Sequence, residues 1–459
     1  ILSRLEVVSL EQQSRRYVQL RYRFSAISVK ILSMKIASAR RVGGKIRLPG
    51  DKSISHRAAI IAAIADGATR VTNYSNGIDC SSTLECLSAL GVAYERAGAD
   101  VIIQGVGQTG LTKPIQPLDC GNSGTTMRLL AGILAGQPFG SVLTGDASLR
   151  TRPMQRITEP IQMMGALVEA DDGHAPLHIA GCRPLTAITY EPRVASAQVK
   201  SCVLFAGLFA DGLTTVTERS TTRDHTERLL TWFGANVLTS GSSISISGQA
   251  PIFARDVRVP GDISAAAYFM TAAACLEGSD LLLTDVGMNP TRSAIVDILR
   301  AVGANVEVTG LSDVCNEPVA DVRIRGGLAH QAGPLIIAGR QTAGLIDELP
   351  VLAVLGSQLN GGIEVRDAAE LRVKESDRIL AVVDNLKRMG ASVSALDDGF
   401  RVARSPVHGA TLDSFGDHRI AMSMAIAGLL AEGDTEIDGA ECVEVSFPGF
   451  FETLGSVVS

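Results

Sequence analysis

Six strongly apolar segments recur along the chain and set its hydrophobic pattern. They cover residues 58–65, 127–135, 202–210, 265–276, 349–359 and 420–430. Each segment is apolar nearly all the way round when it is drawn as a helix, and such helices are buried on every side. The pattern therefore predicts six buried helices, each followed by a glycine turn and a short strand rich in β-branched residues.

A second, amphipathic helix follows each β-rich run and is predicted to end at a glycine. The glycines are Gly91, Gly165, Gly234, Gly303, Gly390 and Gly455. Glycine just after a helix favours its termination, and the apolar alternation that follows predicts a strand. Because these glycines recur every ~65–90 residues, the chain is predicted to repeat a βαβαββ-type unit about six times. The fold class is therefore α/β.

The motif Pro-Gly-Asp occurs at residues 49–51 and again at 260–262, each time directly before a buried helix. This repetition predicts two lobes of three units each, with the chain crossing between them at these two places. We expect lobe one to comprise residues 34–49 and 259–459, and lobe two to comprise residues 50–258. Two crossing strands would form a hinge that lets the lobes close over a ligand.

Residues 1–33 stand apart from this pattern. They are rich in arginine, contain Glu6 and Glu11 as their only acidic residues, and precede Met34, which has the character of a natural start. We interpret them as an upstream extension, disordered or not native to the protein, and exclude them from the fold. A transit peptide is the alternative.

Polar residues gather at the starts of the predicted buried helices. They are Lys52, Ser53 and Arg57; Asn122, Ser123 and Gly124; Ser196, Gln198 and Lys200; Asp262 and Ser264; Asp347 and Glu348; and Asp417, His418 and Arg419. Ser, Asn and Asp in such places can be simple N-caps. Capping does not need arginine or lysine, however, and the unpaired N–H groups of a helix start attract anions. If the six helices point into one cleft, that cleft should bind anions.

Further charged residues lie between the predicted elements. Arg152 follows the strand predicted at 141–144, and Arg223 follows the strand near 213–217. Lys374, Glu375 and Arg378 occur together, and their spacing predicts that Lys374 and Arg378 share one face of a helix. An exposed, salt-bridged helix start is the alternative for these three residues.

Composition narrows the class of ligand. The 459 residues carry a net charge of −6, so basic residues at a site are expected to serve a small anion rather than a nucleic acid. Eight cysteines are scattered without metal-ligand spacing, which predicts a reducing compartment and no zinc site. His56 and His418 also lack such spacing, and no apolar run is long enough to span a bilayer.

These motifs together resemble the 5-enolpyruvylshikimate-3-phosphate synthase family. The matching segments are LPGDKSISHR at 48–57, GNSGT at 121–125, RPM at 152–154, SAQVKS at 196–201, TRDHTE at 222–227, LRVKESDR at 371–378 and GDHR at 416–419. The resemblance covers residues 34–459. It implies a two-lobed, inside-out α/β barrel in which each lobe has three βαβαββ-type units around buried parallel helices.

The resemblance also implies an activity. Members of the family transfer the carboxyvinyl group of phosphoenolpyruvate to the 5-hydroxyl of shikimate-3-phosphate and release phosphate, on the route to chorismate and the aromatic amino acids. By family motif, shikimate-3-phosphate is expected to bind Lys52, Ser53, Arg57, Ser196, Ala197, Gln198, Arg223, Asp347 and Lys374. Phosphoenolpyruvate is expected to bind Lys52, Gly124, Arg152, Gln198, Arg378 and Arg419.

The residue types suit this chemistry. Both substrates are anionic, and guanidinium groups pair well with carboxylates and phosphates. Addition followed by elimination needs a base at the 5-hydroxyl and an acid at the vinyl methylene. Asp347 is the candidate base and Glu375 the candidate acid, with Lys52 as the third catalytic residue. We expect no metal ion or other cofactor, because lysine and arginine supply the positive charge.

One position departs from the family pattern. Many members carry a lysine where Val445 precedes Ser446, so the phosphoenolpyruvate pocket is expected to lack one cation. A methyl group at Gly124 would project toward the same pocket. We therefore expect the protein to be open to glyphosate, and Gly124→Ala to weaken glyphosate binding more than substrate binding.

Two other functions stay open at this point. UDP-N-acetylglucosamine 1-carboxyvinyltransferase is a similar enzyme, but that family usually carries a cysteine in the loop before its Arg-Pro pair, and residues 144–153 contain none. A non-catalytic anion-binding protein would have no need for Asp347 and Glu375. In each case we expect a cytoplasmic monomer with small-molecule ligands and no nucleic-acid or membrane partner.

Overall fold

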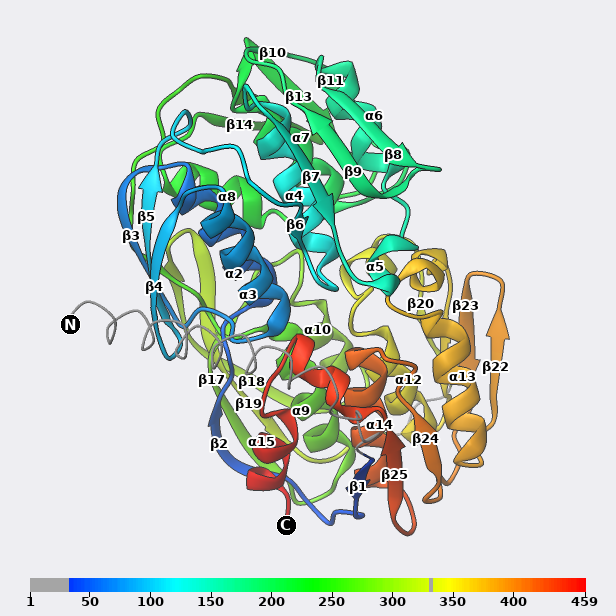
Figure 1. Ribbon diagram of the computed structural model, residues 1–459. Coiled ribbons are helices and arrows are strands. Elements are labelled where there is room, and N and C mark those ends of the chain that lie inside the picture. Colours follow the sequence, from blue (N-terminus) through cyan, green and yellow to red (C-terminus); the bar gives the residue numbers. More distant parts are fainter. Residues whose placement is uncertain (1–32, 330–332) are drawn as a thin grey trace, which may run out of the picture.

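Six α/β units form two lobes in a computed structural model of the protein, which describes residues 33–329 and 333–459 (Figure 1). The predicted extension at 1–33 lies outside the described residues, apart from Ser33. One lobe, at the top of Figure 1, surrounds α4 (Gly124–Ala135) and α7 (Ala197–Gly207). The other, at the bottom, surrounds α9 (Ile263–Cys275) and α12 (Leu349–Gln358). The predicted two-lobed α/β fold is confirmed.

Five four-stranded sheets in the described part of the chain share one strand order. In each sheet a strand that precedes a buried helix pairs in parallel with a strand that follows a buried helix, and two antiparallel strands complete the sheet. In one example the order is β6 (Leu118–Asp119), β7 (Gly140–Thr144), β9 (His174–Ala180) and β8 (Leu167–Asp171). This is the βαβαββ order that the repeats predict.

The other four-stranded sheets follow the same order, and the third sheet of the lower lobe has three strands, of which one is antiparallel. Those of the upper lobe are β16 (Val257–Arg258), β3 (Asp66–Thr72), β5 (Asp100–Val106) and β4 (Ala93–Ala97); and β11 (Thr189–Tyr190), β13 (Leu213–Thr217), β15 (Ser243–Ser247) and β14 (Val237–Ser240), beside a short pair of β10 (Leu185–Thr186) and β12 (Ala210–Asp211). Those of the lower lobe are β2 (Gly43–Arg47), β17 (Asp280–Gly287), β19 (Glu317–Arg325) and β18 (Asn305–Val314); β20 (Leu335–Ile337), β21 (Ile363–Val365), β23 (Gly399–Val402) and β22 (Val393–Leu396); and β24 (Thr411–Asp413), β25 (Thr435–Asp438) and β1 (Met34–Ile36).

Two of these strands pair outside their own unit. β2 precedes the first buried helix of the upper lobe but pairs with β17 of the lower lobe, whereas β16 precedes α9 and pairs with β3 of the upper lobe. The chain therefore crosses between the lobes directly after β2 and directly after β16. Reciprocal hydrogen bonds join the crossings: the Asp51 N–H donates to Pro260 O at 2.8 Å, and the Asp262 N–H donates to Pro49 O at 3.1 Å.

Five of the six buried helices begin earlier than the apolar pattern predicts, and α12 begins at the predicted residue, Leu349. Besides α4, α7, α9 and α12 they are α2 (Lys52–Ala63) and α14 (His418–Leu430). α2 starts at Lys52 rather than at residue 58, because Asp51 caps it by accepting a hydrogen bond from the Ile54 N–H at 2.9 Å. As a consequence Lys52, Ser53 and Arg57 lie within the first two turns of the helix and not ahead of it.

The amphipathic helices end at glycine in five units. They are α3 (Ile78–Ala89), α6 (Gln155–Met163), α8 (His225–Trp232), α10 (Ala294–Ala301) and α13 (Arg378–Arg388), and the glycine that follows each end has a φ between 84° and 100°. The prediction is wrong for the sixth, because α15 (Phe450–Val457) runs through Gly455. After α15 Val458 makes only an isolated bridge with Val42, so no left-handed turn into a strand is needed.

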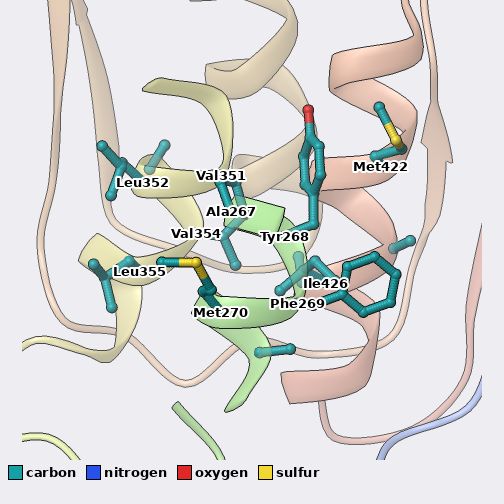
Figure 2. Close-up of a cluster of buried hydrophobic side chains, with 14 of the residues drawn as sticks. Ala267, Tyr268, Phe269, Met270, Val351, Leu352, Val354, Leu355, Met422 and Ile426 are labelled. Carbon is teal, nitrogen blue, oxygen red and sulfur yellow. The ribbon is translucent and has the colours of Figure 1, made fainter. Parts of the chain in front are cut away.

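The buried helices pack against one another inside each lobe. Figure 2 shows side chains of α9, α12 and α14 in one cluster, among them Phe269, Leu355 and Ile426, all at most 1% exposed. Burial of each such side chain stabilises the fold by about 1.5–3 kcal/mol. Separate hydrophobic cores form within residues 54–259 and within residues 36–48 and 263–457. The polar starts of the helices are left to face the space between the lobes.

Candidate active site

A cleft of about 480 Å³ lies between the two lobes and is lined by residues from both. The predicted site residues that line it are Lys52, Ser53, Gly124, Arg152, Ser196, Ala197, Gln198, Arg223, Asp347, Lys374, Glu375, Arg378 and Arg419. Most come from the starts of α2, α4, α7, α12, α13 and α14 or from the loops just before them, whereas Arg152 and Arg223 lie in the loops before α6 and α8. The structure thus brings every predicted site residue except Arg57 into one cleft.

Arg57 lies behind the wall of the cleft and is 3% exposed, which differs from its expected direct contact with substrate. Its guanidinium donates to Ser53 O at 2.9 Å, to Thr226 Oγ1 at 2.7 Å and to Ser201 Oγ at 2.9 Å. Burial lowers the pKa of Arg57 to about 10. Because its donors are occupied by α2, α7 and α8, Arg57 fixes these helices relative to one another.

Lys52 is held by a carboxylate that the sequence reasoning missed. Its Nζ lies 2.6 Å from Oδ2 of Asp79, in the first turn of α3. Burial alone would lower the pKa of Lys52, but the Asp79 carboxylate holds it above its usual value, so the ammonium stays charged. The Lys52 N–H also donates to Asp262 Oδ2 at 3.2 Å, which ties this residue to the crossing.

Positive charge gathers where α4 begins. Arg128 donates to Gln198 Oε1 at 2.7 Å, and the Gln198 amide donates to Thr125 Oγ1 at 2.9 Å. Burial, together with the charges of Arg156 and Arg152, lowers the pKa of Arg128 to about 9. Burial makes the largest contribution and repulsion between the guanidinium groups adds to it, so an anion bound here would relieve that repulsion.

Asp347 stands among cations from both lobes. Its Oδ2 accepts from Arg223 Nη2 at 2.5 Å, while its Oδ1 lies 3.4 Å from Arg419 Nε and 3.4 Å from Arg378 Nη1. Burial alone would raise the pKa of Asp347, but Arg419, Arg223 and Lys374 hold it well below its usual range. The carboxylate is therefore ionised and is a hydrogen-bond acceptor.

Glu375 is the second carboxylate of the cleft. Its Oε2 accepts from Arg378 Nη2 at 2.6 Å, and its Oε1 accepts from Arg152 Nη1 at 3.4 Å. Burial favours the neutral acid, but Arg378 and Arg152 hold the pKa of Glu375 well below its usual range. Arg378 is itself anchored by Asp417, the N-cap of α14, at 2.7 Å.

Ion pairs across the cleft join the lobes. Arg152 and Arg223 of the upper lobe pair with Glu375 and Asp347 of the lower lobe, and Arg156 lies 2.9 Å from Glu370. Buried charges of this kind need partners. An anionic ligand that enters the cleft must therefore take over arginine donors that these carboxylates now occupy.

The local structure around Glu375 differs from the predicted helix. A 3-10 helix, η1 (Ala369–Val373), ends before Lys374, and α13 starts at Arg378. Asp377 is the N-cap and accepts from the Leu380 N–H at 3.1 Å. The prediction that Lys374 and Arg378 share one helix face is therefore wrong, because the cap breaks the helix between them.

Several residues that line the cleft were missed by the sequence reasoning, namely Asp79, Arg128, Arg156, Arg292 and Glu370. Arg128 carries a recognisable signal, since it is the only charged residue in the apolar segment 127–135 and lies four positions after Gly124 on the same helix face. The others sit on amphipathic helices or in loops, where charged residues are common.

His56 and His418, the two histidines considered in the sequence analysis, are both buried. His56 Nδ1 is 2.7 Å from Thr83 Oγ1, and burial and Lys52 lower the pKa of both His56 and His418 well below the usual range. Among residues 33–329 and 333–459, no group of three or more His, Cys, Asp or Glu side chains could hold a metal ion. The helices within the same ranges include none long and apolar enough to cross a membrane.

Acid should destabilise the protein partly through Asp347. Its usual pKa of 3.8 is depressed in the fold, so the unfolded chain binds a proton first as the pH falls. The stabilisation that the ionised Asp347 carboxylate provides is fully present above about pH 4. It is lost as the pH falls toward the lower pKa that Asp347 has in the folded protein. Below pH 4, Asp347→Asn should therefore reduce the slope of the free energy of unfolding against pH by about one proton, or ~1.4 kcal/mol per pH unit. Urea unfolding between pH 3 and pH 7 checks this, and parallel curves for the two proteins would contradict it.

Comparison with known proteins agrees with this geometry. A sequence model described as EPSP synthase (3-phosphoshikimate 1-carboxyvinyltransferase) matches residues 36–454. The 3-phosphoshikimate 1-carboxyvinyltransferases of Koribacter versatilis and Pelotomaculum thermopropionicum are 50% and 49% identical, each covering 93% of this chain and 99% of the relative. The solved EPSP synthase of Acinetobacter baumannii is 42% identical with a TM-score of 0.82, over 93% of this chain and 98% of that one. The chain belongs to the EPSP synthase family.

Proposed function

We propose that the protein transfers the carboxyvinyl group of phosphoenolpyruvate to the 5-hydroxyl of shikimate-3-phosphate and releases phosphate. The observation that carries the proposal is the cleft itself, in which Asp347 and Glu375 stand among arginine and lysine side chains from both lobes. Such a site can bind two anionic metabolites and still offer a base and an acid between them.

We assign shikimate-3-phosphate to the side of the cleft formed by α2 and α7. Ser53, Ser196, Ala197 and Gln198 would contact it there, and Lys374 and Arg223 would supply positive charge. Asp347 would face its 5-hydroxyl. Arg57 would support this subsite through its bond to Ser53 O, rather than bind the substrate directly.

We assign phosphoenolpyruvate to the start of α4, next to Gly124. Arg152, Arg378 and Arg419 would bind its phosphate and carboxylate, with Gln198 and Lys52 reaching it as well. Arg128 also lines this part of the cleft, together with Arg156. Arg128 and Arg156 would supply positive charge in place of the lysine that many members carry where this chain has Val445.

The chemistry then runs in two steps between these groups. In the addition, Asp347 takes the proton of the 5-hydroxyl as its oxygen bonds to C2 of phosphoenolpyruvate, and Glu375 gives a proton to C3. In the elimination, the Glu375 carboxylate takes a proton from C3, the bond from C2 to the phosphate oxygen breaks with its electrons on phosphate, and the double bond forms again. The proton held by Asp347 passes to the departing phosphate, which returns both carboxyl groups to their starting states. Lys52, charged beside Asp79, would stabilise the negative charge that develops.

Glu375 can donate a proton only when its pKa rises above the low value that its arginine neighbours impose. Arg152 and Arg378 hold it ionised. When the phosphate and carboxylate of phosphoenolpyruvate neutralise these two guanidinium groups, their effect on Glu375 weakens and its pKa rises. The acid would thus form only when its substrate is bound.

A phosphate-release assay tests the proposal. The protein is mixed with phosphoenolpyruvate and either shikimate-3-phosphate or UDP-N-acetylglucosamine, and release is expected only with the first acceptor. Release with the UDP-sugar alone would assign the alternative transferase. Tight binding of both substrates in calorimetry without any release would instead indicate an anion-binding protein.

Gly124→Ala should weaken glyphosate more than phosphoenolpyruvate. A Cβ at Gly124 would lie 2.7 Å from Arg128 Nη1 and 3.4 Å from Arg152 Nη1, so the added methyl displaces the arginine ends that an anion would use. We expect the inhibition constant of glyphosate to rise about 30-fold and the KM of phosphoenolpyruvate to rise about 3-fold, within the range for one methyl group in a binding pocket. Equal losses for the two ligands would contradict this.

We also propose that the protein works as a monomer in the cytoplasm. All eight cysteines are free, as expected for a reducing compartment. Light scattering across a range of protein concentrations tests the oligomeric state, and a dimer mass at every concentration would exclude the monomer.

A further inference from the structure

We propose that Arg292 is a positioning residue that holds Lys52 and Asp347 in place relative to each other across the two lobe crossings. The inference rests on the roles proposed above for those two residues. Arg292 lies between β17 and α10, is 2% exposed, and forms part of the wall of the cleft. Nothing in the motifs of the chain points to it.

The Arg292 guanidinium connects the N-caps of two buried helices, one in each lobe. Its Nη1 bonds to Oδ2 of Asp51, whose Oδ1 caps α2. Its Nη2 lies 3.2 Å from Oδ1 of Asp262, which caps α9 through the Ser264 N–H at 2.8 Å. The two aspartates belong to the repeated Pro-Gly-Asp motifs. One cation thus joins both crossings, over sequence separations of 241 and 30 residues.

Both aspartates that Arg292 joins, Asp51 and Asp262, also hold Lys52 in place. It is the first residue of α2, so the Asp51 cap orients its backbone, and its own N–H donates to Asp262 Oδ2 at 3.2 Å. Each aspartate therefore uses one oxygen for Arg292 and the other for the start of α2. Loss of Arg292 would free both carboxylates and let the start of α2 move relative to α9.

The same guanidinium also connects to Glu348, the residue next to Asp347 in the sequence. Arg292 Nη2 donates to Ser264 Oγ, and Ser264 Oγ donates to Glu348 Oε1. Glu348 is the N-cap residue of α12 and directly follows Asp347. A chain of hydrogen bonds therefore runs from Glu348, the sequence neighbour of the candidate base, to the backbone N–H of Lys52, with Arg292 at its branch point.

Arg292→Met tests the inference, because it removes the charge and keeps a similar length. We expect kcat to fall about 30-fold while the KM values change less than about 3-fold, since displacement of reacting groups by ~1 Å costs up to ~10²-fold in rate. Arg292→Lys keeps the charge but cannot fork to two aspartates, so a loss of about 5-fold is expected. Arg323→Met is the matched control: Arg323 pairs with Asp280 on the exposed sheet and should leave kcat unchanged.

A double-mutant cycle with Lys52→Ala separates positioning from other effects. If Arg292 acts through both Lys52 and Asp347, then Arg292→Met should lower kcat of the Lys52→Ala protein by clearly less than about 30-fold, because only the effect through Asp347 remains. A 30-fold loss in both backgrounds would overturn the inference and leave the proposed function standing. Full turnover by Lys52→Ala alone would instead contradict the role proposed for Lys52.

Stability provides a second readout. Arg292→Met leaves two buried carboxylates without their cation and should lower the unfolding temperature. Asp51→Asn combined with Arg292→Met removes one of these charges and keeps a good N-cap, so the unfolding temperature should largely recover while kcat stays low. Recovery of both together would show a merely structural role and overturn the inference.

Discussion

Asp347→Ala should lower kcat about 10³-fold, a loss within the range for removal of a positioned general base. The carboxylate accepts from Arg223 at 2.5 Å and lies 3.4 Å from both Arg419 and Arg378, so it is ionised and firmly placed. Without it the 5-hydroxyl has no acceptor for its proton. The KM of shikimate-3-phosphate should change far less, because the arginines remain and the cleft becomes more positive.

Coupled measurement of phosphate release gives kcat and both KM values for this variant. Asp347→Asn is the closer substitution, since it keeps the size of the side chain but cannot take a proton, and it should be as slow as the alanine variant. Asp384→Ala serves as the control, because Asp384 forms an exposed ion pair with Arg388 at 2.7 Å on α13. A kcat within about 3-fold of the unaltered protein for Asp347→Asn would mean that another group is the base.

The architecture could be predicted because the same physical signal occurs six times. An all-round apolar segment, a glycine turn and a β-rich run leave few ways to bury the apolar surface, and the repeat of Pro-Gly-Asp indicated where the chain crosses. The prediction was wrong where one copy differs. Gly455 lies within α15, because only an isolated bridge follows this helix and no strand requires a sharp turn.

The site could be predicted only in part. The motifs indicate residues that bind substrate or react with it, but not the residues that hold those side chains in position. Asp79 and Arg292 are single charged residues on a helix and in a loop, and such residues are usually exposed. Their importance appears only when the fold brings Asp79 to 2.6 Å from Lys52 and Arg292 between two N-caps. Long-range pairs of this kind depend on the packing of helices far apart in sequence, which the hydrophobic pattern does not specify.

Arg152→Met should raise the KM of phosphoenolpyruvate about 10²-fold, because truncation of one partner in a buried charged contact typically costs 2–5 kcal/mol. Arg152 is 6% exposed and has three groups in reach, Glu375 at 3.4 Å, Asn122 at 2.6 Å and Ser148 at 3.3 Å. It lies next to Gly124 at the start of α4 and also contacts Glu375, the candidate acid. The KM of shikimate-3-phosphate should change less than about 3-fold.

Arg152→Met should also shift the pH profile of kcat/KM, and the charge that is removed determines the direction of the shift. Arg152 is one of the cations that depress the pKa of Glu375, so its removal raises that pKa. Since Glu375 must be protonated to act as the acid, the fall of kcat/KM at high pH should move to higher pH. Arg150→Met is the control, an exposed arginine two positions earlier in α5 (Ala147–Arg150). A profile that moves to lower pH, or that does not move while the KM rises, would mean that Glu375 is not the proton donor and that Arg152 acts in binding alone.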